Sequence, residues 1–366
     1  MQKTLSYPAQ LRATPFAANA ALLVAALLTF FLTSPAQAKP TLSELTASAG
    51  RTVTVAIIDS GVDYTHEDLR GKMWVNEAEL NGLDNVDDDN NGCVDDIYGC
   101  DFRSQVYEAF GYHPGLGGTT YQSDPYLRPD GIGHGTHVAG VIAARRNNGT
   151  GINGVSVDAR IMAVNFILPS NSAQMGDAAL AIHYAVDNGA QIINASFGRH
   201  RISGEDLAKL EAALDYAADH GVLVVASAGN QGRDIDGEYH FYPAGFEHDN
   251  LLTVAAVNPA GELWESSNYG VHSVDVAAPG VGIRSTVPVG PTSMFRKLYD
   301  PSGYKVTEGT SVAAPYVTGL AAQLLAHNPG LSPAELRGAV MDLAETRASL
   351  LGKTVRGGEI PGIALP

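Results

Sequence analysis

The chain has 366 residues, of which 45% are hydrophobic and 17% are charged. No Pro/Ser-rich linker and no internal repeat divides it, so one large domain is expected rather than two. It carries 39 acidic against 23 basic residues, a formal net charge of −16. This excess of acidic groups argues against a nucleic acid partner, whose phosphates require basic surfaces, and is compatible with binding of divalent cations.

The first 38 residues have the features of an export signal. Lys3 and Arg12 precede an apolar run over residues 20–32, and residues 36–38 (AQA) have the small-x-small pattern of a signal peptidase site. The run is shorter than the ~20 residues of a membrane span, although an uncleaved N-terminal anchor is the alternative. We expect residues 1–38 to be removed, leaving a monomeric protein that is secreted or periplasmic and has no stable membrane association.

Apolar, strand-like segments alternate with helical ones along the rest of the chain. In chain order, the predicted elements are a strand at 52–58, a helix at 135–146, a strand at 160–166, a helix at 173–188, a strand at 191–195, a helix at 204–220, strands at 222–227, 251–257 and 274–277, and helices at 310–327 and 333–343. This alternation is typical of an α/β domain with a mainly parallel sheet. We predict a single domain over residues 39–366, with surface insertions at about 74–131 and 284–308.

Three segments far apart in the chain each contribute one polar side chain. Asp59 follows a predicted strand in the sequence VAIIDSG, His134 begins a helix in GHGTHVAG, and Ser311 begins another in GTSVAAP. Because the carboxyl ends of parallel strands and the N-termini of the following helices lie at one edge of a sheet, we expect these side chains to converge. A serine hydroxyl becomes a nucleophile when a histidine takes its proton and a carboxylate orients that histidine.

Structural alternatives exist for each of these residues. Ser311 could be only a helix cap, Asp59 could only cap the turn that follows it, and His134 with His137 could be half of a metal site. No glutamate follows His134 as it would in a zinc-hydrolase helix, which argues against the metal site.

With VVASAGNQG at residues 224–232, these segments resemble the active-site signatures of the subtilase (peptidase S8) family, in the family's order Asp, His, Ser. The resemblance runs from about residue 52 to about residue 344. It implies a three-layer subtilisin-like α/β fold with a mainly parallel central sheet flanked by helices, and a serine endopeptidase. Ser311 would attack, His134 would shuttle the proton, Asp59 would orient His134, and Asn230 with the Ser311 N–H would hold the oxyanion.

Other functions are weighed against this interpretation. An acid-active sedolisin relative would use a Glu and an Asp on one helix, and a lipase-like α/β-hydrolase would need Gly-x-Ser-x-Gly, which is absent. A catalytically silent binding or maturation protein on the same scaffold is the alternative from another class. Asn230 by itself would be an ordinary turn residue.

The resemblance also implies a polypeptide substrate bound in an extended form. Ser196, Phe197 and Gly198 would offer a strand edge to the substrate backbone, and Ala226, Ser227 and Ala228 would form the opposite wall. The small side chains of this wall predict an open pocket that accepts apolar or aromatic residues. The alternative is that both segments are buried strand ends.

Residues 87–96 (DDDNNGCVDD) match the start of a calcium-binding loop. The oxygen-bearing positions are Asp87, Asp89, Asn91 and Asp95, with a glycine at position six, but the twelfth position is Tyr98 instead of a glutamate. A helix–loop–helix EF-hand is therefore not expected, and an EF-like loop within an insertion is. The alternative is an acidic turn without an ion.

A second calcium site is implied by resemblance to a loop of the thermostable subtilases. There Asn148, the carbonyl groups of Thr150 and Ile152, and the distant Asp68 would be ligands.

The chain contains two cysteines, Cys93 and Cys100. Export would place them where disulfides persist, so we expect them to be bridged; two free thiols are the alternative.

Overall fold

The structure, a computed structural model, describes residues 45, 47–102, 130, 132–167, 175–289 and 298–362. They belong to one unit of the chain, residues 42–366. The predicted signal at residues 1–38 lies outside the described residues, as do parts of both predicted insertions.

An eight-stranded sheet forms the centre of this unit. Its strands are β1 (Val53–Asp59), β2 (Ala159–Asn165), β3 (Ile192–Ala195), β4 (Leu223–Ser227), β5 (Leu251–Val257), β6 (Val276–Pro279), β9 (Glu345–Thr346) and β10 (Gly358–Glu359). The order is β2-β1-β3-β4-β5-β6-β10-β9, and every pair is parallel except β9 with β10. Strands β1 to β6 are apolar along almost their whole length because both faces of a parallel sheet are covered.

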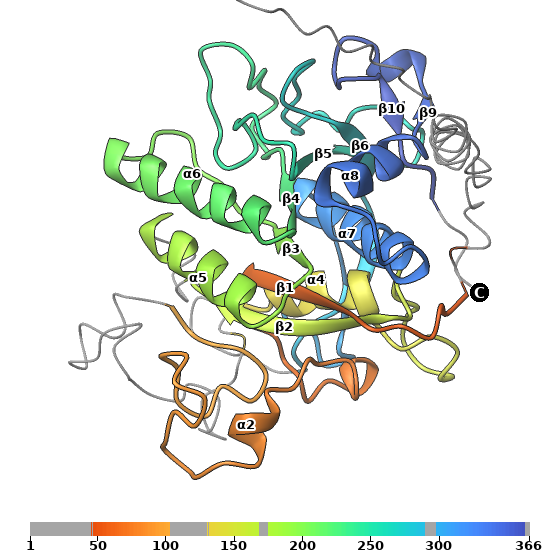
Figure 1. Ribbon diagram of the computed structural model, residues 1–366. Coiled ribbons are helices and arrows are strands. Elements are labelled where there is room, and N and C mark those ends of the chain that lie inside the picture. The colour runs from red at the N-terminus through yellow and green to blue at the C-terminus, as the bar shows by residue number, and fades with distance from the viewer. Residues whose placement is uncertain are drawn as a thin grey trace, which may run out of the picture. The chain divides into compact units, whose positions relative to one another are not determined.

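Helices pack on both faces of the sheet (Figure 1). α4 (His134–Ala143), α7 (Thr310–His327) and α8 (Pro333–Met341) share one hydrophobic core with strand residues such as Val55 and Ile57. α5 (Met175–Asp187) and α6 (Gly204–Asp219) share the other with Ala56 and Ile58. Successive strand side chains point to opposite faces, so each strand contributes to both cores. The predicted three-layer α/β fold is confirmed.

Helix α7 lies between the sheet and α8 and is buried along its whole circumference. Ser311 and His327 are the two residues of the helix that are not buried. The helix after it, α8, begins with a capping box, in which Ser332 accepts a hydrogen bond from the Glu335 N–H and the Glu335 carboxylate accepts one from the Ser332 N–H.

The predicted insertions contain more regular structure than expected. In the second, β7 (Ile283–Thr286) and β8 (Tyr304–Thr307) form an antiparallel ribbon, missed because both segments mix polar with apolar residues and show no apolar run. The hydroxyls of Ser285 and Thr286 donate hydrogen bonds to α4 carbonyls, so this ribbon supports the helix that begins with His134.

The described part of the first insertion covers the edge strand β2 and includes the short helix α2 (Glu77–Leu80), while η2 (Glu67–Leu69) lies just before the insertion. Trp74 N–H donates to the Ile161 carbonyl at 2.8 Å and Phe102 N–H to the Asn165 carbonyl at 2.6 Å. These bonds occupy β2 backbone groups that an exposed edge would leave unpaired.

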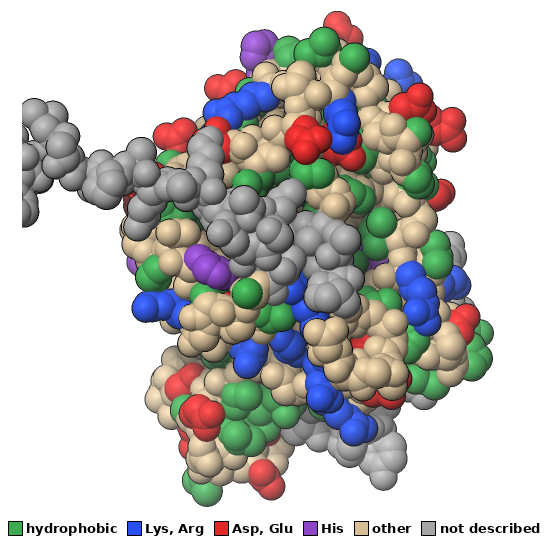
Figure 2. Space-filling model, turned by 90° about the vertical axis from the view of Figure 1, so that its right-hand side faces the viewer, with side chains coloured by type: hydrophobic (Ala, Val, Ile, Leu, Met, Phe, Trp, Pro, Cys, Tyr) green, Lys and Arg blue, Asp and Glu red, His purple; other side chains and the backbone are tan. Residues whose placement is uncertain are grey.

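Charged side chains of both signs are interspersed over the face drawn in Figure 2. The negative charge of the chain is therefore not gathered in a single patch on this face. None of the helices in the described part of the chain has the length and hydrophobicity that a membrane crossing needs.

Candidate active site

Asp59, His134 and Ser311 meet at the carboxyl edge of the parallel strands. Asp59 is the last residue of β1, His134 the first of α4 and Ser311 the second of α7. The approach is close because Gly135 follows His134: a Cβ at this position would lie 2.0 Å from the carbonyl oxygen of Gly61. The three elements converge as the sequence predicted.

The Asp59 carboxylate is fully buried and faces the His134 ring. His134 Nδ1 lies 2.8 Å from Asp59 Oδ1 and 2.9 Å from Oδ2, and the Ser60 N–H donates to Oδ1 at 2.7 Å. Burial lowers the pKa of His134, but the charge and hydrogen bond of Asp59 outweigh it, so the net pKa is raised above the usual value. The carboxylate therefore favours the tautomer protonated at Nδ1 and stabilises the imidazolium.

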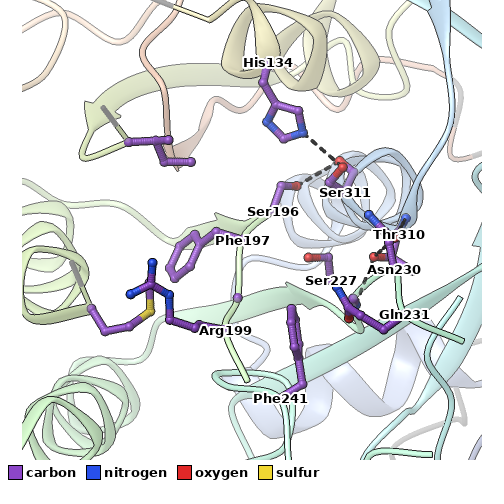
Figure 3. A pocket seen from close by; sticks show the side chains of 14 residues that line it. His134, Ser196, Phe197, Arg199, Ser227, Asn230, Gln231, Phe241, Thr310 and Ser311 are labelled. Atoms are coloured by element: carbon purple, nitrogen blue, oxygen red, sulfur yellow. Dashed lines mark hydrogen bonds between the residues drawn. The ribbon is translucent and has the colours of Figure 1, made fainter. Parts of the chain in front are cut away.

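The other ring nitrogen faces the serine. His134 Nε2 lies 3.0 Å from Ser311 Oγ, as Figure 3 shows. With the proton on Nδ1, Nε2 is an acceptor and the Ser311 hydroxyl donates to it. This is the geometry in which a hydroxyl can lose its proton as it attacks.

Asn230 is held so that its amide nitrogen faces the same space as the hydroxyl. Its Oδ1 accepts hydrogen bonds from Thr310 N–H at 2.9 Å and Thr310 Oγ1 at 2.8 Å. A Cβ built at Gly309 would lie 3.2 Å from Ser311 Oγ and 3.4 Å from Asn230 Nδ2, so both groups border one position. Thr310 also accepts the Gly229 N–H at 3.0 Å. Its role was missed, although it stands between the glycine and serine of the motif.

A further carboxylate, Asp130, organises the entry to α4 and was also missed. It is fully buried and accepts hydrogen bonds from Ser60 Oγ, from the backbone N–H groups of Ile132, Gly133 and Thr136, and from Thr136 Oγ1. Burial raises the pKa of Asp130, although these hydrogen bonds oppose the rise. Ser60 Oγ also accepts the Gly135 N–H, so Asp130 connects the loop after Asp59 with the helix that begins at His134. The feature of the sequence that could have indicated this role is an acidic residue four positions before His134, just ahead of the helix N-terminus.

His137 lies on the buried side of α4. Burial, with a contribution from the nearby His134, lowers its pKa to about 4, and its Nε2 contacts the Lys305 carbonyl oxygen at 3.3 Å. Among the described residues, the group of three side chains placed to hold a metal ion consists of Glu79, Asp89 and Asp96 and includes neither histidine. This agrees with a structural role for His137.

A cavity of about 380 Å³ opens beside Ser311 and is lined by both predicted wall segments. Ser196, Phe197 and Gly198 line it on one side and Ser227 and Gly229 on the other. Ala226 and Ala228, however, are fully buried and belong to the core beneath α5 and α6, because alternate strand side chains point away from the cavity. Of the predicted second wall, only Ser227 therefore faces the substrate space.

The predicted pocket is present, but small side chains are not its whole lining. Phe241 and Arg199 also line the cavity, and Figure 3 shows the Phe241 ring standing between the two walls. Neither residue lies in a motif, and Phe241 reaches the cavity from the connection between β4 and β5, so no local pattern pointed to it.

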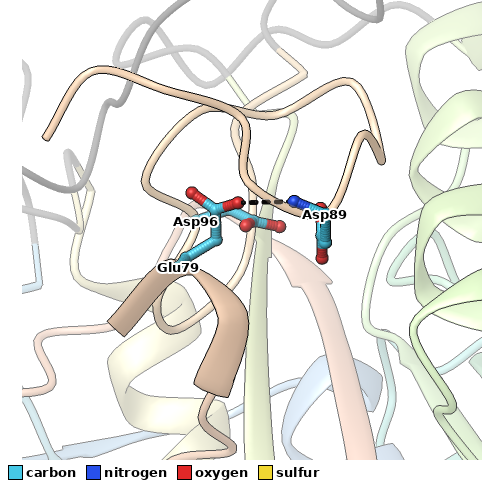
Figure 4. A group of neighbouring side chains, drawn as sticks. All are labelled: Glu79, Asp89 and Asp96. Carbon is cyan, nitrogen blue, oxygen red and sulfur yellow. Dashed lines mark hydrogen bonds between the residues drawn. The ribbon is translucent and has the colours of Figure 1, made fainter. Parts of the chain in front are cut away.

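The acidic insertion gathers three carboxylates, but only one belongs to the predicted set. Carboxylate oxygens of Glu79, Asp89 and Asp96 lie within 4.8 Å of one another (Figure 4). The amide groups of Asn76 and Asn91 reach the same place, each contacting Asp89 and Asp96. Burial raises the pKa of Asp96 to about 6, which a bound cation would oppose. These oxygen-bearing groups suit a calcium ion.

The prediction of Asp87 and Asp95 as ligands does not match this arrangement. Both oxygens of Asp95 accept the Asn85 N–H, and Asp95 has a φ of 49°, which turns the chain so that Asp96 points inward instead. The Asp87 carboxylate accepts the N–H groups of Asn91 and Gly92 and closes the loop.

The second predicted calcium set is brought together around Asp68. Its carboxylate accepts hydrogen bonds from Asn148 Nδ2 at 2.6 Å, Ile152 N–H at 3.0 Å and Tyr304 Oη at 3.0 Å, and lies 3.5 Å from Thr150 Oγ1. The group at Ile152 is thus an N–H instead of the predicted carbonyl. Residues 147–153 line a surface pocket of about 320 Å³ beside this carboxylate.

The predicted bridge between Cys93 and Cys100 is present, with the two Cα atoms 6.2 Å apart. It closes the turn that follows the acidic loop. Cys93 is buried against Phe102 and Met162 in the core below α5.

Comparisons with known proteins agree with this geometry. A sequence model described as "Subtilase family" matches residues 50–357. A thermophilic serine proteinase of Bacillus sp. (strain AK1) is 37% identical, over 80% of this chain and 56% of its own length. Subtilisin-like protease 1 of Plasmodium berghei (strain Anka) is 31% identical, over 79% and 45%. The chain therefore spans about half the length of these curated relatives.

Among solved structures, that of a cold adapted subtilisin-like serine proteinase matches with a TM-score of 0.61 and 24% identity. The match covers 87% of this chain and 91% of that one, and it shows the fold.

Proposed function

The chain belongs to the subtilase family, and on that premise we propose that it is an exported, calcium-stabilised serine endopeptidase. It hydrolyses peptide bonds of polypeptides through an acyl-enzyme. One observation carries the proposal: Asp59, His134 and Ser311 form a continuous hydrogen-bonded line that ends at a cavity bordered by the Asn230 amide.

The first half of the reaction forms the acyl-enzyme. Ser311 Oγ attacks the carbonyl carbon of the scissile bond while its proton passes to His134 Nε2. Asp59 stabilises the resulting imidazolium. The oxyanion of the tetrahedral intermediate accepts hydrogen bonds from Asn230 Nδ2 and from the Ser311 N–H, which lies in the first helical turn and has no intrahelical acceptor. On collapse, His134 gives its proton to the leaving amine and the C–N bond breaks.

The second half releases the product. Water loses a proton to His134 Nε2 and attacks the ester carbonyl, and the proton then returns to Ser311 Oγ as the C–O bond breaks. Thr310 acts through Asn230, because its N–H and hydroxyl both hold the amide oxygen of Asn230 and leave the nitrogen facing the cavity.

Replacing Ser311 by alanine tests the assignment. Turnover of a peptide anilide should fall by roughly 10⁶-fold, the magnitude found when the nucleophilic serine of subtilisin is removed. A serine-directed phosphonate should label the native protein and not the variant. Near-normal turnover by Ser311→Ala would reject the proposal, and an unlabelled, inactive native protein would favour a catalytically silent binding protein.

The proposal includes structural calcium at the Glu79–Asp89–Asp96 cluster and at the loop around Asp68. At the cluster, three carboxylates supply hard oxygen donors, and bound calcium would neutralise charges that otherwise repel one another. At the second place, Asp68 supplies one carboxylate, and the Asn148 side chain lies against it. The Ser311→Ala protein should melt at a higher temperature in calcium than in a chelator. At a calcium concentration a hundredfold above Kd, binding at one site raises the free energy of unfolding by about 2.7 kcal/mol.

Glu79→Gln should reduce that increment, whereas the control Glu211→Gln, at an exposed position on α6, should not. Equal melting temperatures in calcium and chelator would reject the calcium part alone. Export and removal of residues 1–38 are supported by the sequence features of this segment, and N-terminal sequencing of the protein recovered from the cell exterior tests them. Sedimentation of the same protein tests the expectation of a monomer.

A further inference from the structure

One aromatic ring, that of Phe241, lines the cavity beside Ser311 and lies close to both of its walls. A Cβ built at Gly198 would lie 2.2 Å from Cε1 of Phe241, and one built at Gly229 would lie 2.8 Å from the same atom. Gly198 belongs to one wall of the cavity and Gly229 to the other. One edge of the Phe241 ring therefore lies close to both walls and narrows the space between them.

The ring is held firmly in this position. Arg199 and Tyr242 exchange two backbone hydrogen bonds, of 2.9 and 3.1 Å, which tie the segment that carries Phe241 to the first wall. The Phe241 carbonyl accepts the Gly245 N–H at 2.7 Å, and the side chain is 6% exposed. To swing the ring aside would open a gap in the core, because Phe241 packs with the cluster beneath the wall.

The walls also indicate where the substrate lies. Within the described residues, the backbone N–H and C=O groups of Phe197 and Gly198 have no hydrogen-bond partner. An extended peptide can therefore pair with this segment as an added strand. When its carbonyl reaches Ser311 and Asn230, the side chain of the residue before the cut points between the two walls, toward Phe241.

We propose that Phe241 determines the specificity of this site, so that the residue before the cut must be glycine, alanine or serine. The inference rests on the proposed endopeptidase function. A bulky side chain at that position meets the ring, because overpacking of a closed recess is penalised and each misfitted methylene costs about 10-fold or more in discrimination. A substrate with alanine before the cut should be preferred over one with phenylalanine by at least about 10²-fold in kcat/KM.

The native protein provides the first test. Blocked tetrapeptide anilides that differ only in the last residue (Gly, Ala, Ser, Leu or Phe) are compared by kcat/KM. Preference for the three small residues supports the proposal. Equal or higher values for Leu and Phe overturn it and leave the endopeptidase function intact. Failure to cleave any member, together with failure of phosphonate labelling, would instead contradict the proposed function.

The second test asks whether substitution of Phe241 changes the preference for the residue before the cut. Phe241→Ala should raise the Phe/Ala ratio of kcat/KM by at least about 10-fold, because removing the ring opens the recess. The matched control is Phe246→Ala, the same substitution five residues later in the segment, where the ring packs on Tyr242 outside the cavity lining. The control should keep the native ratio. If Phe241→Ala does not fold, Phe241→Val carries the same expectation, and an unchanged ratio in a folded variant overturns the proposal.

Discussion

Asp130→Asn tests whether a carboxylate outside the catalytic line positions it. Asp130 Oδ1 accepts from Ser60 Oγ, Ile132 N–H and Gly133 N–H, at 2.9, 3.0 and 2.6 Å. Oδ2 accepts from Thr136 N–H and Oγ1 at 2.8 and 2.6 Å. An asparagine that keeps its oxygen on the first side turns an NH₂ group toward two donors of Thr136. Two charge-assisted hydrogen bonds are then lost.

The magnitude follows from these bonds. Each hydrogen bond to a charged group contributes about 1.5–3 kcal/mol, and the smaller desolvation cost of a neutral amide offsets part of the loss. We expect unfolding to become easier by about 2–4 kcal/mol. Denaturant unfolding should be measured in the Ser311→Ala background, so that self-digestion does not interfere.

The pH profile separates positioning from simple stability. His134 must be neutral to accept a proton, so activity falls as the pH drops through its raised pKa. Asp130 is one of the charges that raise this pKa, with Asp59, while His137 on the same helix is neutral there because its own pKa is about 4. Without the Asp130 charge, the acidic limb of kcat/KM should move to lower pH.

Asp158→Asn is the matched control. Asp158 is another buried carboxylate, with hydrogen bonds from Ser48, Ala49 and Gln323 at the opposite end of the strands. The Asp158→Asn variant should have a lower free energy of unfolding, and its kcat/KM should depend on pH in the acidic range as that of the native protein does. If the Asp130→Asn variant has the native free energy of unfolding and the native acidic pH dependence of kcat/KM, the reasoning is refuted.

Three further variants test the proposed active site and its surroundings. Asp59→Asn should lower kcat by about 10⁴-fold, because the Ser60 N–H fixes the amide oxygen and turns the NH₂ toward Nδ1, which imposes the wrong tautomer; a loss below tenfold at neutral pH would contradict this. Asn230→Ala should lower kcat by about 10²–10³-fold with little change in KM, the magnitude documented for the corresponding family residue, and a pure KM effect would argue against oxyanion binding. Serine at both Cys93 and Cys100 should lower the unfolding free energy by about 2–3 kcal/mol, and an unchanged melting curve would show that the loop is held by other contacts.

The sequence predicted most of the central fold because the strands repeat one simple signal. A segment such as β5, Leu251–Val257, is buried on both faces and reads as an unbroken apolar run. The polar residues that end β1 and begin α4 and α7 could be placed at one edge by topology alone. The short strands β7 to β10 were missed because their sequences, IRST, YKVT, ET and GE, contain no apolar run.

The parts of the site that were missed come from tertiary contact rather than from local pattern. Phe241 reaches the cavity from a loop between two strands. Asp130 acts through hydrogen bonds to Ser60, which follows Asp59, and to Thr136 in the helix that begins with His134. The structure brings Asp96, rather than the predicted Asp95, close to Asp89, and Asp95 between them has a positive φ that no sequence pattern indicated. Alternation along a loop holds only while the backbone stays regular.

The burial of α7 on every side has a consequence for how the candidate active site forms during folding. A helix without a polar face has no stable existence in water before its neighbours are in place. Ser311 therefore reaches His134 only once the sheet and the flanking helices have assembled around α7. Under the proposed function, incompletely folded copies have no proteolytic activity, and their exposed segments are substrates for copies that have folded.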